Sequence, residues 1–403
     1  MPDTHVTQVD IAIVGGGLVG ASLACALAPL IERAGIRVAV IEPSSLALEG
    51  RAAYQPSFDE RSSAIAYGSR RHFEHMGLWE RLSAHAEPIR HIHVSQRGRL
   101  GVTRLSAQEA GLDALGYVIP NAWMGQVMLS RLAELPIDWR CLASVASMQP
   151  TKNGYRLTLE DGQCLETGLT VLADGGRSPL KAQLGIEDES FEYHDHAVIA
   201  NVTLSQPHHN VAYERFDSAG PMALLPLSGN DMALVWTMPA AAADGVMAMG
   251  DMDFLAALQQ RFGERVGYFC HVGARHRYPL SKRHAREQIR PHLAILGNAA
   301  HALHPVAGQG FNLALRGVMD LSRALGSSID AGLPIGDIAS LECFEQQRQR
   351  DRQRIAEGSH WLVTLFGIDN TALAHVRGAG LGALNLVGPL RRTFMRYAMG
   401  IER

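Results

Sequence analysis

The sequence has few of the residues that cross-link small secreted proteins or hold structural metals. Its 403 residues include five cysteines, which are widely spaced and form no C-x-x-C pair. An odd number of dispersed cysteines supports neither a disulfide framework nor a thiolate metal site. We therefore expect a reducing, cytoplasmic location and no bound metal.

An excess of positive charge is also lacking. The chain carries 37 basic and 40 acidic residues, a formal net charge of −3, and three of the basic residues are lysines. Proteins that gather nucleic acid on their surface need a basic field. A nucleic-acid partner is not expected.

Several catalytic motifs are missing as well. The sequence contains no G-x-S-x-G, no Walker A and no H-E-x-x-H, so hydrolase, NTPase and zinc-protease classes lack support. Residues 11–31 carry no charge and have about the length that spans a bilayer. This stretch contains three consecutive glycines and no Lys or Arg precedes it, so we expect neither a signal peptide nor a membrane span.

The N-terminal segment has the pattern of a βαβ unit. An apolar run at residues 9–14 predicts a buried strand, a triple glycine follows, and residues 18–33 predict a helix. A second strand at residues 37–41 ends at Glu42, which lies 22 residues beyond Gly20. An acidic residue at this distance is placed to bind ribose hydroxyls of a dinucleotide.

The glycines Gly15, Gly17 and Gly20 form a G-x-G-x-x-G motif inside this unit. The first permits a tight turn, the second lets the backbone approach a diphosphate, and the third allows close packing of the helix on the strand. The helix N-terminus offers unpaired N–H groups to the phosphates. The alternative is a purely structural glycine turn, which the strand, helix and Glu42 around the motif disfavour.

The rest of the chain suggests an interrupted nucleotide-binding domain. Strands predicted at residues 155–159 and 170–173 flank a turn at residues 161–162 and return to the first sheet. Between residues 190 and 283, short strands broken by Pro and Gly predict a separate, mainly antiparallel sheet. A buried strand at residues 293–296 precedes a mainly helical remainder.

Two further clusters follow predicted strands, and each is common turn chemistry when taken alone. The first begins at Asp174-Gly175-Gly176, and the second runs from Gly297-Asn298 through His301 to Asn312. With the N-terminal motif, and with Asp59–Ala64 and His304–Leu313, the sequence resembles the aromatic-ring flavoprotein hydroxylases of the para-hydroxybenzoate hydroxylase type. Within them it is most similar to the ubiquinone-biosynthesis hydroxylases of the 2-octaprenyl-6-methoxyphenol hydroxylase branch.

The resemblance implies an α/β fold. A discontinuous Rossmann-like FAD-binding domain would comprise residues 1–75, 100–180 and 285–330, and a mainly antiparallel substrate domain would comprise residues 76–99 and 181–284. A helical region would follow at residues 331–403.

The resemblance also implies a set of FAD-binding residues, with Glu42 at the adenosine ribose and Arg61 and Gln126 on the adenine and phosphate side. The whole set is Gly15, Gly17, Gly20, Glu42, Arg61, Gln126, Asp174, Gly297, Asn298, Gly308, Gln309, Gly310 and Asn312. The loop under the flavin ring would contain Pro305, Gly308, Gln309 and Gly310, and these four are our candidates for residues at the reaction centre. Glycines before a helix also suit this role physically, because the backbone can lie beneath a flat ring and the helix N-terminus can stabilise negative charge.

The sequence departs from the broad family at one of these positions. The family has Gly-Asp where this chain has Gly297-Asn298. Asparagine still accepts hydrogen bonds and can also donate them, but the negative charge is lost. Binding of FAD is still expected, but the reactivity of the bound flavin is expected to differ from that in the broad family.

The activity that the resemblance implies is hydroxylation of a prenylated phenol in ubiquinone synthesis. FAD, O₂ and a flavin C4a-hydroperoxide would carry the reaction, with electrons from NAD(P)H or from a protein donor. Alternatives on the same scaffold are a prenyl reductase, an amine oxidase, and a binding protein without catalysis. The phenol-binding residue, the ring position and the prenyl length do not follow from the sequence.

Two remaining features have alternative interpretations. His301 and His304 have a spacing that suits metal ligands on a helix, but no third ligand lies nearby, so we expect none. After Gly388-Pro389, the apolar residues Leu390, Phe394, Tyr397 and Ile401 recur every three or four residues among arginines. Such a helix could pack on the chain's own core, contact other ubiquinone-synthesis proteins, or bind weakly to the inner face of the cytoplasmic membrane.

Overall fold

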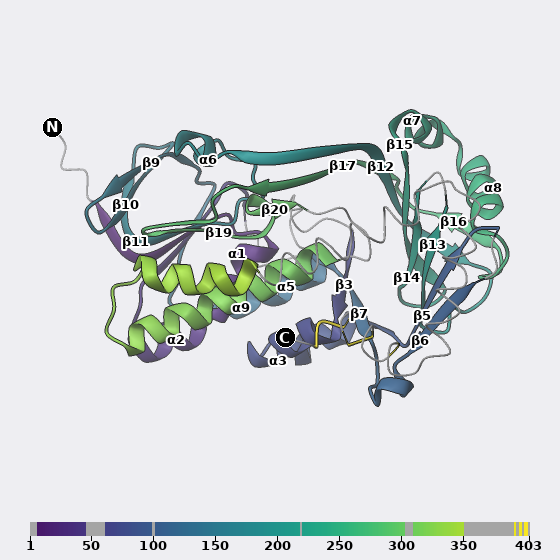
Figure 1. Ribbon diagram of the computed structural model, residues 1–403, viewed down its shortest axis with the longest axis horizontal. Helices are drawn as coiled ribbons and strands as arrows, with labels where there is room; N and C mark the ends of the chain where they lie inside the picture. The colour runs from purple at the N-terminus through teal and green to yellow at the C-terminus, as the bar shows by residue number, and fades with distance from the viewer. Residues whose placement is uncertain are drawn as a thin grey trace.

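Two lobes lie side by side and are joined by two long strands (Figure 1). The computed structural model describes residues 6–45, 61–98, 101–217, 220–302, 309–349, 391, 395, 396 and 399–401. Three regions lie outside these described residues: the expected region around Asp59, the loop at residues 303–308 and most of the C-terminal segment. The expected α/β class with two sheet-containing parts is confirmed.

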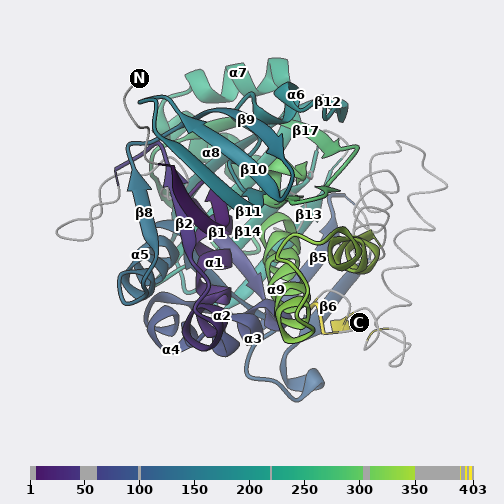
Figure 2. The same ribbon diagram turned by 90° about the vertical axis from the view of Figure 1, so that its left-hand side faces the viewer.

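The first lobe is built on an eight-stranded sheet among the described residues. Its parallel part has the order β19, β11, β1, β2, β8 and lies toward the viewer in Figure 2. These strands are β1 (Thr7–Val14), β2 (Val38–Glu42), β8 (Asp138–Cys141), β11 (Cys164–Leu172) and β19 (Leu293–Ile295). Antiparallel additions are β9 (Val145–Thr151), β10 (Gly154–Leu159) and β18 (Ile289–Arg290). The predicted return of two later strands to the first sheet is confirmed, because β11 pairs with β1 and β10 pairs with β11.

Alternating side chains of the parallel strands enter two separate cores. Ile11 and Ile13 face a helical layer, whereas Ala12 and Val14 face the β9–β10 hairpin. Both faces are therefore covered, as parallel sheets require. The helical layer consists of α1 (Leu18–Ala26), α2 (Ala28–Ala34), α5 (Asn121–Leu132) and α9 (Gln309–Asp330), and the short α6 (Leu180–Gln183) lies on the other face.

The first helix is shorter than the sequence predicts. One helix was expected over residues 18–33, but the structure has α1 and α2 with a break at Leu27. Pro29 lies at the start of α2. Proline has no N–H and its ring clashes with the preceding helical turn, so it is tolerated at the start of a helix and not inside one.

The second lobe is formed by a nine-stranded, mainly antiparallel sheet, again counted over the described residues. Its order is β20, β17, β12, β15, β14, β13, β5, β6, with β16 beside β12. The strands are β5 (His91–Gln96), β6 (Val102–Ser106), β12 (Asp188–Leu204), β13 (Val211–Phe216), β14 (Met222–Pro226), β15 (Asp231–Pro239), β16 (Phe269–Val272), β17 (His276–Ala285) and β20 (His301–Ala302). We expected residues 100–180 in the first domain, but β6 forms a hairpin with β5 and joins this large sheet.

The two faces of the large sheet have different neighbours. Helices α7 (Ala240–Ala248) and α8 (Asp251–Phe262) pack on one face, which we call the outer face. The opposite, inner face packs partly on a three-stranded sheet of β3 (Ser62–Ala66), β7 (Gly116–Pro120) and β4 (Glu87–Ile89). Figure 1 shows that β12 and β17 extend from this sheet across to the first lobe. The inner face is thereby turned toward the parallel sheet.

Short elements complete the described structure. They are α3 (Tyr67–His75), α4 (Trp79–Leu82) and the single 3₁₀ turns η1 (Ser83–His85), η2 (Gln108–Ala110) and η3 (Gly297–Ala299). Met395 and Met399 of the C-terminal segment are buried against Leu105 of β6. The described part of that segment therefore packs on the chain's own core.

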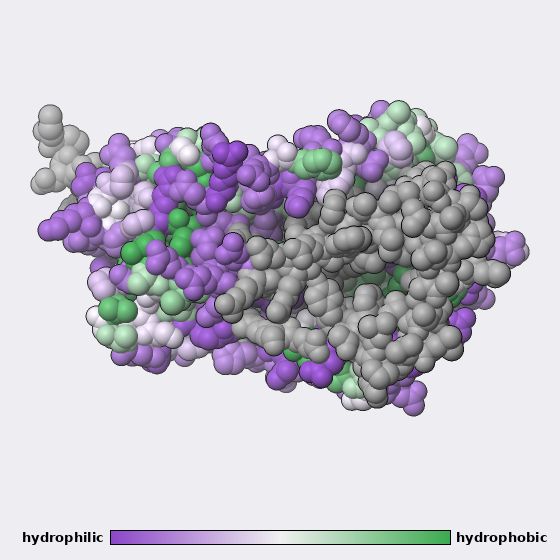
Figure 3. Space-filling model, viewed as in Figure 1, coloured by the Kyte–Doolittle hydropathy of each residue, from purple (hydrophilic) through white to green (hydrophobic). Residues whose placement is uncertain are grey.

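The coloured surface in Figure 3 is mostly hydrophilic, with apolar residues in small groups. Large apolar side chains that are well exposed include Leu142 and Met252, at 76% and 80%. Single exposed apolar residues are ordinary on protein surfaces. No described helix combines the length and the apolar character that crossing a bilayer requires.

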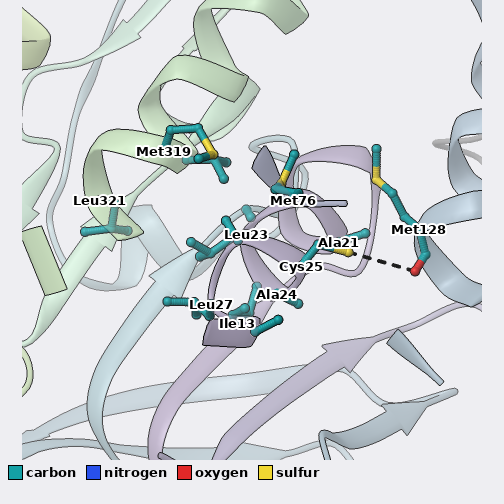
Figure 4. Close-up of a cluster of buried hydrophobic side chains, with 14 of the residues drawn as sticks. Ile13, Ala21, Leu23, Ala24, Cys25, Leu27, Met76, Met128, Met319 and Leu321 are labelled. Carbon is teal, nitrogen blue, oxygen red and sulfur yellow. Dashed lines mark hydrogen bonds between the residues drawn. The ribbon is translucent and has the colours of Figure 1, made fainter. Parts of the chain in front are cut away.

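The core between α1, α5 and α9 gives a direct test of this packing. Figure 4 shows Leu23 of α1 near Met319 and Leu321 of α9, and Leu23 is 0% exposed. Leu23→Ala should lower the free energy of unfolding by about 3 kcal/mol, because it leaves a cavity that the neighbours cannot fill. Met252→Ala, at an exposed position on α8, is the matched control. It should change the free energy of unfolding by less than about 0.5 kcal/mol. Denaturant unfolding followed by circular dichroism measures both, and equal losses would contradict the packing.

Candidate functional site at the carboxyl ends of the parallel strands

The turn after β1 has a geometry that depends on glycine. Gly15 has a φ of +103°, and a Cβ added there would lie 2.6 Å from the carbonyl oxygen of Ala173. The Gly15 N–H donates to the carbonyl of Ile41 at 2.9 Å. The turn is thus pressed between the ends of β11 and β2, and side chains are excluded from it.

The third glycine of the motif brings α1 against this turn. A Cβ at Gly20 would lie 1.9 Å from the carbonyl oxygen of Gly15, a distance that no substitution can accommodate without movement. Gly17 is the N-cap of α1 and has an ordinary φ of −64°, and no described side chain caps the helix. The first N–H groups of α1 therefore suit an anion at the edge of the sheet.

Glu42 lies at the end of β2, beside the glycine turn. Its carboxylate is 8% exposed and accepts hydrogen bonds from the N–H groups of Gly16 at 2.6 Å and Ser44 at 3.0 Å. Each carboxylate oxygen has a further lone pair with which it could accept from a ribose hydroxyl. Trp139 of β8 also borders this corner, 3.1 Å from the position of a Cβ at Gly16. Sequence reasoning missed Trp139, because the contact depends on β8 joining the sheet beside β2.

Asp174 occupies the corresponding place at the end of β11. The N–H of Ala173 donates to Val14 at 2.8 Å, which ties this strand end to β1. The Asp174 carboxylate accepts from the N–H of Gly176 at 2.8 Å and also from the hydroxyl of Ser178. It therefore orders the turn that follows β11, next to the glycine turn.

The end of β19 supplies the next part of the same edge. Leu296 N–H donates to Leu172 at 2.9 Å, and the chain then turns at Gly297, where φ is +61°. A Cβ on Gly297 would lie 2.9 Å from the Cγ2 of Val19 on α1. Asn298 follows and is exposed. The three strand ends and the start of α1 are therefore in one place.

A buried lysine holds the η3 turn, and the sequence gave no signal for it. Lys181 is 7% exposed, and its ammonium donates to the carbonyl of Ala299 at 2.8 Å and to Asp188 at 2.6 Å. The pairing satisfies a charge that would otherwise be costly to bury. Lys181 is thus a positioning residue for the turn that carries Asn298.

Asn312 has a structural task at the start of α9. It is 1% exposed, its Oδ1 accepts from Ala66 N–H at 2.8 Å, and its Nδ2 donates to the carbonyl of Ala64 at 2.7 Å. These bonds fix the start of α9 on β3. Gly310 lies in the first turn of this helix, and the space around its Cβ position is open.

The other predicted residues belong to other elements or cannot be placed. Arg61, just before β3, stacks on the ring of Tyr278 in β17 at 4.9 Å, and Gln126 is exposed on α5. Gln309 begins α9, and its side chain is not described. Pro305 and Gly308 lie outside the described residues, so the flavin-ring loop stays a prediction.

Histidines at the site do not form a metal centre within the described residues. His301 is 7% exposed on β20, and His304 lies outside the described part. No group of three or more His, Cys, Asp or Glu in the described ranges could hold a metal ion. The ring of His208 contacts the backbone carbonyl of Leu227 at 2.7 Å.

Taken together, this geometry defines a dinucleotide-binding flavoprotein fold. Several features meet at the topological switch point of the parallel sheet. They are the glycine turn, the uncapped N-terminus of α1, the acidic residue on the second strand and the turns after two further strands. Residues 8–355 match the family model described as an FAD binding domain. The chain belongs to this FAD-binding family, and it is an FAD-dependent monooxygenase with O₂ as co-substrate.

Two similar proteins span nearly the whole chain. A ubiquinone hydroxylase named UbiL from Rhodospirillum rubrum is 37% identical, over 97% of this chain and 89% of that protein. The 3-demethoxyubiquinol 3-hydroxylase of Escherichia coli is 30% identical, over 97% and 98%. Among solved structures, the p-nitrophenol 4-monooxygenase PnpA of Pseudomonas putida has a TM-score of 0.80 at 17% identity, covering 98% of this chain and 99% of that one. This last likeness concerns the fold.

The role of the second glycine can be tested by substitution. The φ of Gly17 suits any residue, so Gly17→Val should fold, but its side chain should push a diphosphate away from the start of α1. We expect purified Gly17→Val without bound FAD and with unchanged far-UV circular dichroism. Gly245→Val, in an open position on α7, should keep FAD. Stoichiometric FAD in the Gly17 variant would refute the assignment.

The exposed position of Asn298 predicts an effect on the flavin. Asn298→Asp adds a negative charge where the resemblance places the ribityl chain, and this charge should disfavour the reduced, anionic flavin. The reduction potential of bound FAD should fall, with FAD content unchanged. Asn153→Asp, on the exposed turn before β10, adds the same charge and should leave the potential unaltered. A potential that does not change in the Asn298 variant would place this residue away from the ring system.

Proposed function

We propose that this protein hydroxylates the aromatic ring of a prenylated phenol in ubiquinone biosynthesis. The observation that carries the proposal is the 37% identity with the protein named ubiquinone hydroxylase, extending over 97% of the chain and thus over both lobes. A likeness restricted to the first lobe would support FAD binding alone. Because it includes the large sheet, it supports a shared class of substrate as well.

The arrangement of the two lobes is consistent with this chemistry. FAD fits at the carboxyl edge of the parallel sheet, where Gly15 and Gly20 leave no space for side chains. From there the chain passes through η3 into β20, which pairs with β17 at the edge of the large sheet. A ligand extending from α1 past Asn298 would end between the first lobe and the inner face. An aromatic substrate would bind on that face.

Bound FAD would supply the activation of O₂, with electrons from NAD(P)H or a protein donor. The tasks of the polypeptide are to hold the substrate ring, to exclude water and to control the phenolic proton. The inner face suits the first two tasks, because Ala212 and Leu225 make it apolar beside Val118 of β7. The third task requires a polar group on this face.

Two other functions on the same scaffold make different predictions. A prenyl reductase or an amine oxidase would not couple O₂ consumption to ring hydroxylation. A binding protein would need no FAD, although the glycine turn is intact in this chain. Neither alternative is favoured by a described contact.

Partners and location follow from the proposed substrate. A polyprenyl phenol resides in a membrane, so we propose weak, peripheral contact with the membrane and contact with other proteins of ubiquinone synthesis. The buried positions of Met395 and Met399 favour packing over anchoring for the described part of the C-terminal segment. Neither contact has a described surface that supports it.

Loss of the protein gives a direct test of the proposal. A cell that lacks it should accumulate a quinone precursor without one ring hydroxyl during aerobic growth, because the proposed hydroxylation would no longer occur. Mass spectrometry of extracted lipids measures the precursor, and complementation with the Gly17→Val variant should not restore the product. Accumulation of a precursor altered only in prenyl saturation would favour the reductase.

A further inference from the structure

One carboxyl group on the inner face has no part in the site described so far. Glu214 lies on β13, between Val94 of β5 and Ala223 of β14 in the strand register. Successive side chains on a strand point to opposite faces. The preceding residue, Tyr213, contacts Phe262 of α8 on the outer face, with ring centroids 5.8 Å apart. Glu214 is therefore on the inner face.

A second contact fixes the same orientation. Ala212, two residues before Glu214, packs with Ile89 of β4 and Val118 of β7 on the inner face. Glu214 shares this side of the strand and is partly buried. The face on which a substrate ring would lie thus carries a carboxyl group in an apolar setting.

Among the described residues, no side chain pairs with the Glu214 carboxyl. It makes no hydrogen bond or ion pair with another side chain of the described ranges, and its register neighbours Val94 and Ala223 are apolar. Burial raises the pKa of the Glu214 carboxyl to about 8. A perturbed carboxyl facing a binding surface is typical of functional sites.

The charged groups closest in the register point away from it. Arg215 lies over the ring of Phe262 on the outer face, 5.6 Å from its centroid, and the ring of His93 contacts Tyr213 there. Burial and nearby arginines lower the pKa of His93 to about 4, so this ring is neutral. The charged groups on the outer face therefore do not offset the negative charge of an ionised Glu214.

Titratable groups on the inner-face side have other partners. Arg61 stacks on Tyr278 of β17, and Glu87 of β4 accepts a hydrogen bond from Asn210. Two further groups have no such partner among the described contacts: His276, at the start of β17, is exposed, and Asp195 of β12 has a pKa that burial raises as well. None of these groups contributes to the raised pKa of Glu214, whose cause is burial.

We propose that Glu214 binds the phenolic oxygen of the substrate and accepts its proton during hydroxylation. This inference rests on the proposed function. In the proton transfer, the phenol O–H bond breaks, a new O–H bond forms on the Glu214 carboxylate, and the electron pair stays on the phenol oxygen. The ring becomes more electron-rich at the carbons that receive oxygen, and the proton leaves to water after turnover.

The basicity of Glu214 suits this task. A phenol has a pKa of about 10, so an ordinary carboxylate with a pKa near 4.3 is a weak base toward it. A carboxylate with a pKa of about 8 is much closer to the phenol, and proton transfer costs less. Since only the ionised form accepts a proton, the rate should rise with pH and level off above about 8.

The experiment uses the FAD-loaded protein and one defined probe, 2-methoxy-6-(3-methylbut-2-enyl)phenol in detergent micelles. Bound FAD is reduced by light with EDTA as the electron donor and is then mixed with the probe and O₂. The hydroxylated product is measured from pH 6 to 9.5. For Glu214→Gln we expect a rate about 100-fold lower and independent of pH, with unchanged FAD content. The carboxamide can still hydrogen-bond, so the probe's Kd should change by less than about threefold.

Two controls separate the possible outcomes. Glu264→Gln, on an exposed turn, should retain the rate and the pH dependence of the unaltered protein. Infrared difference spectra of the unaltered protein against Glu214→Gln should show a protonated carboxyl that ionises near pH 8.

The inference and the proposed function fail in different ways. If the unaltered protein hydroxylates the probe and Glu214→Gln does so with the same rate and pH profile, the role of Glu214 is refuted and the proposed function stands. A carboxyl that is already ionised at pH 6 also refutes the role. If the unaltered protein consumes O₂ without hydroxylating the probe, the proposed function fails and the inference fails with it.

Discussion

The close contact between Gly20 and the carbonyl of Gly15 is the constraint on which the site depends. It lets α1 start directly above the end of β1, so that the helix N-terminus points along the carboxyl edge of the sheet. The ends of β11 and β19 are hydrogen-bonded beside it through Ala173 and Leu296. A side chain at Gly20 would separate helix and turn, and the anion-binding geometry would be lost with them.

The second lobe depends on the first through the long strands β12 and β17. These strands carry the large sheet, whose outer face is closed by α7 and α8, while its inner face is turned toward the parallel sheet (Figure 1). In the proposed arrangement, cofactor and substrate would approach one another from two different sheets. The first sheet contributes mainly backbone groups and glycines, and the second contributes a face that carries the carboxyl of Glu214 on β13.

Much of the first lobe could be predicted from sequence because its signals are local. The spacing of the glycines, Glu42 and the strand before Asp174 each fall within a short segment, and the structure brings them together. The break at Leu27 was missed, although Pro29 was a visible reason for it. Lys181 and Glu214 gave no signal, because their roles depend on burial by strands that are distant in sequence.

The large sheet shows why such burial escapes sequence reasoning. β13 pairs in parallel with β5, more than a hundred residues earlier in the chain, and this pairing puts Val94 beside Glu214. Alternation along β13 separates its two faces, but it does not tell which one is turned toward the cofactor. That choice is made by α7 and α8, which cover the outer face.

The most direct measurement is a crystal structure of the protein with FAD bound. The account predicts the diphosphate at the N-terminus of α1, a ribityl chain passing Gly297 and Asn298, and a flavin ring that faces the inner side of the large sheet. A diphosphate remote from α1, or a flavin ring turned away from that sheet, would contradict it.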